Sequence, residues 1–164
     1  MRFIPIFAIM SKITAYFHIV FGTKKRKQTI PKEHREDLYR FIWSVISGLD
    51  CELVRIGGVS DHIHMLVNLN SSISLSELVR RIKAGSSGWM SSDSRFSLFE
   101  GWAAGYFASS VSPEHKEAVI NYIRNQEEHH RFHTIEEELK SFCDWMGISF
   151  DERPGVSSEP VEFH

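Results

Sequence analysis

Apolar residues follow two periods along this chain, and each period predicts one kind of element. Alternation of apolar and polar residues, as at Phe17, Ile19 and Phe21, predicts strands. Apolar residues three and four positions apart predict helices with one buried face. The strands are expected at 15–21, 52–56, 62–69 and 105–111. The helices are expected at 31–49, 74–90, 113–130 and 135–146.

The order of these elements predicts a fold of the α+β class. The first six follow the order of a ferredoxin-like antiparallel sheet (βαββαβ) with its helices on one face, and extra C-terminal helices follow. Pro31 suits a first helical turn, and Ser74 or Ser76 can cap the second helix. Gly57-Gly58 is expected to stop the second strand. The other face of the sheet is expected to stay open for a site or a partner.

A length of 164 residues suits one main domain. We expect residues 1–10 to be an N-terminal extension, 11–150 to be the main domain and 151–164 to be a flexible tail. The apolar stretch at the start is too short to span a bilayer, so no membrane segment is expected. Cys51 and Cys143 lack the spacing of metal ligands and suit a reducing compartment, so we expect a cytoplasmic protein.

Charge is distributed unevenly along the chain. Residues 1–90 hold 13 Lys or Arg against 7 Asp or Glu, whereas residues 91–164 hold 6 against 14. The densest basic run follows the first strand and consists of Lys24, Lys25, Arg26 and Lys27. Such a run is either a solvated loop or an edge that contacts phosphate groups.

Two histidines lie on the third predicted strand. Because side chains alternate between faces, His62 and His64 share one face with Leu66 and Asn68, while the residues between them face the core. Two imidazoles in this spacing can bind one metal ion, and Asp61 is placed to orient one of them. The alternative is a pair of ordinary surface or hydrogen-bonded histidines.

The helix predicted over 113–130 carries Ala118, Tyr122 and Gln126 at successive spacings of four, so they form one stripe. A tyrosine hydroxyl is a nucleophile only when it is deprotonated or strongly polarised. The Gln126 carbonyl, one turn further on, can ligate the same metal. The alternative is a tyrosine packed between helix and sheet, with the glutamine as solvated surface.

Six segments of the chain, spread from about Ser11 to Arg153, resemble motifs of one family and follow its order. They are residues 16–24, 56–67, 82–87, 105–112, 122–130 and 147–153. The family is that of the single-tyrosine HUH transposases of the smallest insertion sequences, which includes the REP-associated tyrosine transposases. Two positions depart from its pattern. The chain has Gly101-Trp102-Ala103-Ala104 where a Trp-Gln pair is frequent, and Pro154 where an aromatic residue is frequent.

The resemblance implies that residues 11–150 are a transposase catalytic domain. In it Tyr122 would be the nucleophile and His62, His64 and Gln126 would hold Mg²⁺ or Mn²⁺, of which imidazole ligands favour Mn²⁺. The substrate would be single-stranded DNA with hairpin-forming ends, cleaved and rejoined through a 5′-phosphotyrosine. Members of the family are homodimers in which the tyrosine helix of one subunit is able to complete the partner's site.

Several residues outside this centre are predicted to contact DNA: Lys24, Lys25, Arg26, Lys27, Lys83, Ser86 and Ser87. For the last three, helix-end capping is the alternative. Phe107, Trp89 and Trp102 are candidates for base stacking, with core packing as the alternative. His129, His130 and His133 look like a zinc cluster, but histidines at a helix end are also favoured by the helix dipole.

Three other functions stay open at this point. A replication or transfer nickase would use the same HUH chemistry, but such enzymes carry larger domains. A non-catalytic nucleic-acid module of ferredoxin-like fold would display aromatic side chains on its central strands, where this chain has histidines. An inactivated or domesticated copy would keep the motifs without the activity.

Overall fold

A computed structural model describes residues 13–129 and 134–147 of the chain. The predicted extension at 1–10 and the predicted tail at 151–164 lie outside the described residues. The chain divides into two compact units, the first ending at Gln126 and the second beginning at Glu127. Within the described residues, none of the helices combines the length and the apolar character needed to cross a membrane.

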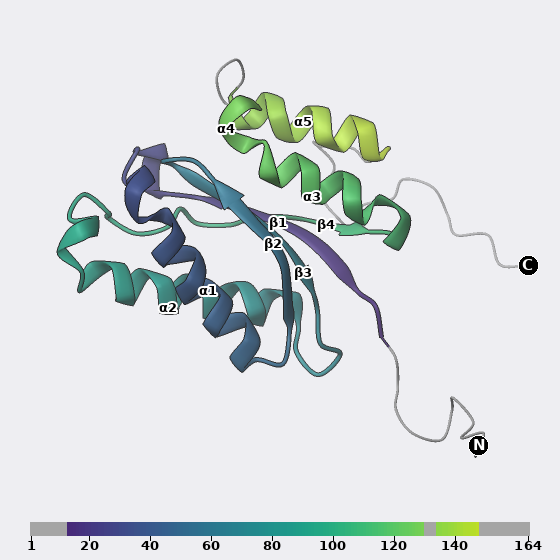
Figure 1. Cartoon of the computed structure of the whole chain (residues 1–164), viewed down its shortest axis with the longest axis horizontal. Coiled ribbons are helices and arrows are strands. Elements are labelled where there is room, and N and C mark those ends of the chain that lie inside the picture. Colours follow the sequence, from purple (N-terminus) through teal and green to yellow (C-terminus); the bar gives the residue numbers. More distant parts are fainter. Residues whose placement is uncertain (1–12, 130–133, 148–164) are drawn as a thin grey trace, which may run out of the picture. The chain divides into compact units, whose positions relative to one another are not determined.

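The first unit is built on a four-stranded antiparallel sheet with the strand order β2-β3-β1-β4 (Figure 1). Its strands are β1 (Tyr16–Gly22), β2 (Glu52–Gly58), β3 (His62–Asn68) and β4 (Phe107–Val111). The central strands β1 and β3 contain no Lys, Arg, Asp or Glu and are mostly buried. Such composition is expected where other elements pack on both faces of a sheet.

One face of the sheet packs against two helices, α1 (Arg35–Gly48) and α2 (Leu75–Ser91). The register pairs Ile19 with Met65 and Phe21 with Ile63, and these four side chains lie in the core under the helices. Burying a side chain of this size stabilises the fold by about 1.5–3 kcal/mol. The arrangement confirms the predicted α+β, ferredoxin-like fold.

Capping residues set where two helices begin. The Ser74 hydroxyl accepts a hydrogen bond from the Glu77 N–H at the start of α2. Of the two predicted candidates, Ser74 and Ser76, Ser74 is therefore the N-cap. In the second unit, Thr134 and Glu137 form a reciprocal capping box at the start of α5 (Ile135–Met146). A cap of this kind contributes about 1 kcal/mol. Both helices begin within one residue of the predicted position.

Four predicted elements have boundaries that were wrong by two residues or more. The helix expected from Pro31 begins with a 3-10 turn at Lys32–His34, so α1 itself starts at Arg35. Strand β2 continues through Gly57 and ends at Gly58, two residues later than predicted. Strand β4 begins at Phe107, because Gly105 has a left-handed φ of 79° that does not fit a strand. The helix expected over 113–130 is divided into a 3-10 turn at Pro113–His115, α3 (Lys116–Arg124) and α4 (Gln126–His129), with an interruption at Asn125.

The second face of the sheet is not left open as predicted, because α3 lies on it against β2 and β3 (Figure 1). Gly57 of β2 permits this approach, since a Cβ atom at that position would stand 2.7 Å from the carbonyl oxygen of Ile123. Gly57 pairs with His64 across the two strands, and directly paired residues share a face. Helix α3 therefore packs on the face that carries the histidines.

Candidate active site

Three histidines lie together on the face of the sheet toward α3. His62 and His64 come from β3, and His18 comes from the neighbouring strand β1. None of the three has accessible surface. The direct partner of His64 on β1 is Val20, so His18, two residues earlier, is its diagonal neighbour. Buried imidazoles need polar partners, and those partners fix how the rings are oriented.

Each predicted histidine ligand contacts a different polar group through its Nδ1 atom. Nδ1 of His62 lies 2.6 Å from Oδ1 of Asp61, and the orienting role of Asp61 stays a prediction. Nδ1 of His64 lies 2.9 Å from Nε2 of His18, and these two rings stack at 21°. Ring nitrogens of His62 and His64 come within 4.8 Å of each other. Nitrogen atoms this close could be ligands of one cation.

Tyr122 reaches the histidines from α3. Its ring centroid lies 5.7 Å from that of His64 and 5.8 Å from that of His18, both in edge-to-face contact. Val119 and Ile123, three residues before and one residue after it, are buried and hold α3 on the sheet. The predicted nucleophile therefore contacts one of the predicted histidine ligands, His64, within one chain.

Gln126 is the first residue of α4 and is almost fully buried. Its side-chain Nε2 donates a 3.4 Å hydrogen bond to the backbone carbonyl of Tyr122. Gln126 therefore lies next to Tyr122, as predicted, although the helix is interrupted at Asn125. Because the amide nitrogen points at that carbonyl, the amide oxygen would be the metal ligand. The ligand role of Gln126 stays a prediction.

The predicted DNA-contacting run is a tight turn directly after β1. Lys24, Lys25 and Lys27 are exposed, and Lys25 and Arg26 have left-handed φ angles of 55° and 56°. Buried Thr23 anchors this turn, because its hydroxyl donates to the carbonyl of Lys27 and its N–H donates to the carbonyl of Asp61. The basic turn is thereby tied to the residue that precedes His62.

The other residues predicted to contact DNA lie on α2, and two of them, Lys83 and Ser86, form hydrogen bonds within the fold. Lys83 Nζ donates to the carbonyls of Ala103 and Gly105 and lies over the Phe21 ring. Burial lowers the pKa of Lys83.

Buried Ser86 donates to the carbonyl of Ile82 and accepts from Nε1 of Trp102. Contact of Lys83, Ser86 and Ser87 with DNA stays a prediction. Helix-end capping by the two serines was wrong, because α2 continues to Ser91.

The three candidate stacking aromatics lie in two environments. Trp89 stacks on Phe41, and Trp102 packs edge-on against Phe21, so both contribute to the core. Phe107 instead lies on the histidine face, with its ring edge-on to His18. His130 and His133 of the alternative zinc cluster lie outside the described residues, as does the side chain of His129.

His18 is the one member of this cluster that sequence reasoning left without a role. Alternation already placed it on the face opposite Phe17 and Ile19. The signal that connects it with His64 is the pairing register of β1 and β3, which a single sequence does not specify.

Comparison with known proteins addresses the family and the fold of this chain. Residues 11–126 match the sequence profile of the family described as transposase IS200 like. No curated protein gives a sequence match. A protein from Deinococcus radiodurans R1, assigned as a transposase, is similar in fold, with a TM-score of 0.54 and 21% identity over 71% of this chain and 93% of that one. A REP-associated tyrosine transposase bound to a REP hairpin has a TM-score of 0.55 and 16% identity over 74% of each chain.

The two structural likenesses support the fold alone, because both are under 25% identical to this chain. The family rests on the sequence profile, which spans more than half of the chain and includes His62, His64, Tyr122 and Gln126. The predicted family is thereby confirmed, and this protein belongs to the IS200-like transposases.

Proposed function

We propose that this transposase cleaves and rejoins single-stranded DNA through Tyr122, with a divalent cation held by His62, His64 and Gln126. The observation that carries the proposal is the edge-to-face contact between the rings of Tyr122 and the fully buried His64, whose centroids lie 5.7 Å apart. A tyrosine that served only to pack α3 would not need two buried imidazoles beside it. The coarser activity, transposition of DNA, follows from the family.

The donor atoms fit a divalent cation. With Nδ1 engaged by Asp61 or His18, Nε2 would be the ligand atom of each histidine, and Gln126 would add a carbonyl oxygen. Mixed nitrogen and oxygen donors suit Mn²⁺ and accept Mg²⁺ where that ion is abundant. A cation bound there would offset the negative charge of a phosphodiester and polarise it toward attack.

The covalent step assigned to Tyr122 conserves atoms and needs no external energy. The phenolic oxygen forms a bond to phosphorus, the bond from phosphorus to the 3′ oxygen breaks, and the leaving oxygen takes up a proton. The phenolic proton is released. Because one phosphate ester replaces another of similar energy, a 3′-hydroxyl from a second strand can reverse the step and rejoin the DNA. The chain accordingly has no G-x-x-x-x-G-K-[ST] nucleotide loop.

The proposed substrate is single-stranded DNA next to a hairpin. The exposed basic turn at Lys24 to Lys27 is tied to Asp61 through Thr23, so a phosphate backbone bound there would run toward the histidines. The fold is shared with a REP-associated tyrosine transposase that binds a REP hairpin. A strand outside a duplex also exposes the phosphate that Tyr122 must reach.

The test is formation of a covalent protein–DNA adduct on a denaturing gel. Labelled single-stranded DNA from the flanks of the gene, carrying its hairpins, is incubated with protein and either Mn²⁺ or a chelator. We expect an adduct with Mn²⁺ only, complete loss in Tyr122→Phe, and loss of at least 100-fold in His64→Ala. Tyr39→Phe, on the helix layer across the sheet, is the matched control and should keep wild-type activity.

An adduct that persists in Tyr122→Phe would show that another residue is the nucleophile. Undiminished activity in chelator would remove the metal from the mechanism. Hairpin binding without any adduct, by every form of the protein, would favour the binding module or the inactivated copy.

A further inference from the structure

The His18–His64 contact is not explained by the proposed roles of the other residues. His18 is fully buried in the middle of β1, and its Nε2 atom lies 2.9 Å from Nδ1 of His64. Two aromatic rings hold it there, Phe107 at 6.2 Å and Tyr122 at 5.8 Å, both edge-on. A buried histidine in contact with a predicted metal ligand is placed to influence the orientation of that ligand.

The contact joins two ring nitrogens, so one of them must carry the proton and donate it. If His18 donated, the neutral His64 ring would carry its own proton on Nε2 and could not bind a metal through that atom. If His64 donates from Nδ1, its Nε2 keeps a lone pair for a cation. Only the second arrangement is compatible with His64 as a ligand.

We propose that His18 is a positioning residue that accepts the Nδ1–H hydrogen bond of His64 and so presents Nε2 of His64 to the cation. The inference rests on the proposed function, because it assigns a partner to one of that site's ligands. The equivalent partner of His62 is Asp61, at 2.6 Å from the corresponding Nδ1. Each histidine ligand then has its own acceptor, one a carboxylate and the other an imidazole.

The choice of an imidazole at position 18 has a physical reason. An aspartate there would place a negative charge on a central strand with no accessible surface, which is costly without a close cation. A neutral imidazole supplies an acceptor without that charge, and its flat ring stacks on His64 at 21°. Glutamine can place an amide oxygen near the position of Nε2, whereas phenylalanine keeps the ring and removes the acceptor.

The experiment compares wild type, His18→Gln and His18→Phe. Mn²⁺ affinity is measured by titration calorimetry, and folding is checked by thermal unfolding. We expect His18→Phe to weaken Mn²⁺ binding roughly 10–100-fold, the range found for partners of metal ligands, and His18→Gln to restore it to within about threefold. Nitrogen-15 spectra of the Mg²⁺-loaded wild type should show the proton on Nδ1 of His64, with coupling across the hydrogen bond to Nε2 of His18.

Three results would overturn the inference while leaving the proposed function in place. The first is wild-type Mn²⁺ affinity in a folded His18→Phe variant, and the second is a proton on Nε2 of His18 in the Mg²⁺-loaded protein. The third is a loss of binding in His18→Gln as severe as in His18→Phe, with both folded, which would contradict the acceptor role. Absence of Mn²⁺ and Mg²⁺ binding by the wild-type protein would instead overturn the metal site and the inference together.

Discussion

Single residues decide how closely helix α3 approaches the sheet at the candidate site. Gly57 lies opposite His64 on the neighbouring strand, where the carbonyl of Ile123 leaves no room for a side chain. The backbone of Gly57 is not in the left-handed region, so the requirement for glycine there is one of space. The absence of one carbon atom thus sets the distance between Tyr122 and the histidines.

We predict that Gly57→Ala pushes α3 away from the sheet. The new Cβ would meet backbone at 2.7 Å, so the free energy of unfolding should fall by about 1–3 kcal/mol, and adduct formation should slow at least tenfold. Gly48→Ala is the control, because no atom lies within 4 Å of its Cβ position at the end of α1. Chemical denaturation and the adduct assay measure the two effects. A Gly57→Ala protein as stable and active as wild type would contradict this account.

Lys83 is a second residue whose role can be decided by stability. Its ammonium donates to two carbonyls of the segment that leads into β4, so we predict that Lys83→Met lowers the free energy of unfolding by about 1–2 kcal/mol. Arg81→Met, an exposed change two residues earlier on α2, should have little effect. If Lys83→Met is as stable as wild type but binds DNA more weakly, the predicted phosphate contact is its main role.

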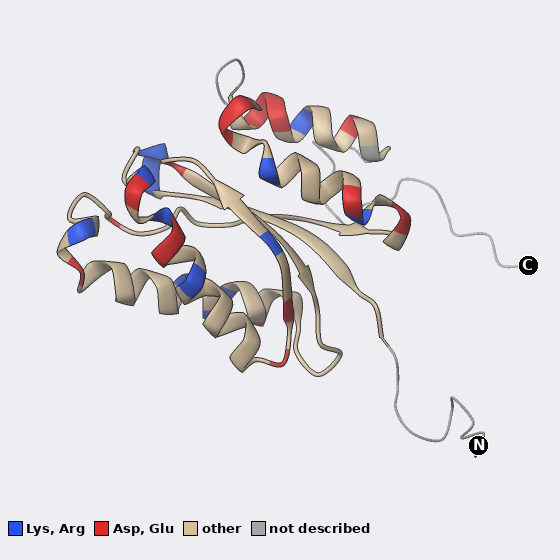
Figure 2. Ribbon diagram, viewed as in Figure 1, with Lys and Arg blue, Asp and Glu red and all other residues tan. Residues whose placement is uncertain are grey.

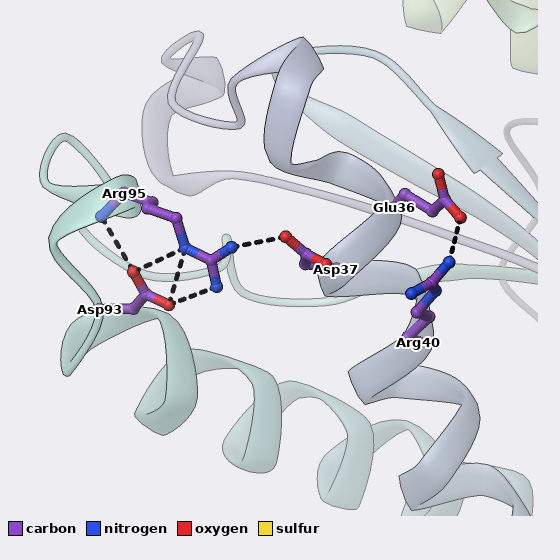
Figure 3. A network of polar contacts seen from close by, with 5 residues as sticks. All are labelled: Glu36, Asp37, Arg40, Asp93 and Arg95. Atoms are coloured by element: carbon purple, nitrogen blue, oxygen red, sulfur yellow. Dashed lines mark hydrogen bonds and ion pairs between the residues drawn. The ribbon is translucent and has the colours of Figure 1, made fainter.

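At the scale of elements, α1 is joined to the segment after α2 by an exposed ion-pair network (Figure 3). Arg95 pairs with Asp93 at 2.7 Å and with Asp37 of α1 at 2.5 Å, whereas Arg40 and Glu36 pair within α1 alone. Hydrogen bonds from the Arg95 side chain and backbone lower the pKa of Asp93 to about 2. Among the five residues drawn in Figure 3, Arg95 is the one that links the two elements.

We predict that Arg95→Leu lowers the unfolding temperature by roughly 1–3 °C at neutral pH, as expected for an exposed pair. The pKa of Asp93 is lower in the folded protein than its ordinary 3.8, so the contribution of its carboxylate to folding stability is complete above about pH 4. It is lost as the pH falls toward 2. The difference in unfolding temperature between wild type and Arg95→Leu should therefore become smaller as the pH falls from about 4 toward 2, which thermal scans measure.

Arg40→Leu is the matched control for the network, since it removes a pair inside one helix (Figure 3). Its effect at neutral pH should be smaller than that of Arg95→Leu. A gap between Arg95→Leu and wild type that stays constant down to pH 2 would show that Asp93 does not stabilise the fold through this network.

Over the whole molecule, the two units differ in charge. The chain up to Gln126 holds 16 Lys or Arg against 11 Asp or Glu, and the chain beyond it holds 3 against 10. Figure 2 shows blue at the turn of Lys24–Arg26 and red on α4 and the start of α5. DNA, being an anion, is therefore expected to bind the first unit.

We predict that the triple variant Lys24→Ala, Lys25→Ala and Lys27→Ala binds single-stranded DNA with a weaker salt dependence. Each phosphate contact with a single strand contributes about 0.7 to the slope of log affinity against log salt, so three contacts should reduce it by roughly 2. Fluorescence anisotropy at several salt concentrations measures the slope. An unchanged slope would mean that these lysines form a solvated turn.

The number of chains that build one site can also be tested. Tyr122 and His64 contact each other within one chain, so we predict that a mixture of Tyr122→Phe and His64→Ala proteins forms no adduct above background. Recovery of activity in the mixture would show that subunits share sites, as the family resemblance allows. Light scattering tests the predicted homodimer separately.

The sequence by itself determined the order of elements, the α+β class and the face on which His62 and His64 lie. These depend on periods of two and three to four residues, which are local properties of the chain. It also predicted that Asp61 lies where it can orient one of the two histidines, because it is adjacent to them in sequence. The family was predictable for the same reason, since its motifs are continuous segments.

Only the tertiary structure decided what lies beside these residues. The pairing of β1 with β3 brings His18 to His64, and the approach of α3 at Gly57 brings Tyr122 to both. The partners of Lys83 also could not be predicted from the sequence, because the carbonyls that it contacts lie 20 and 22 residues further along the chain. Strand register and the seating of a helix on a sheet depend on contacts between distant segments, and periodicity within one segment carries no information about them.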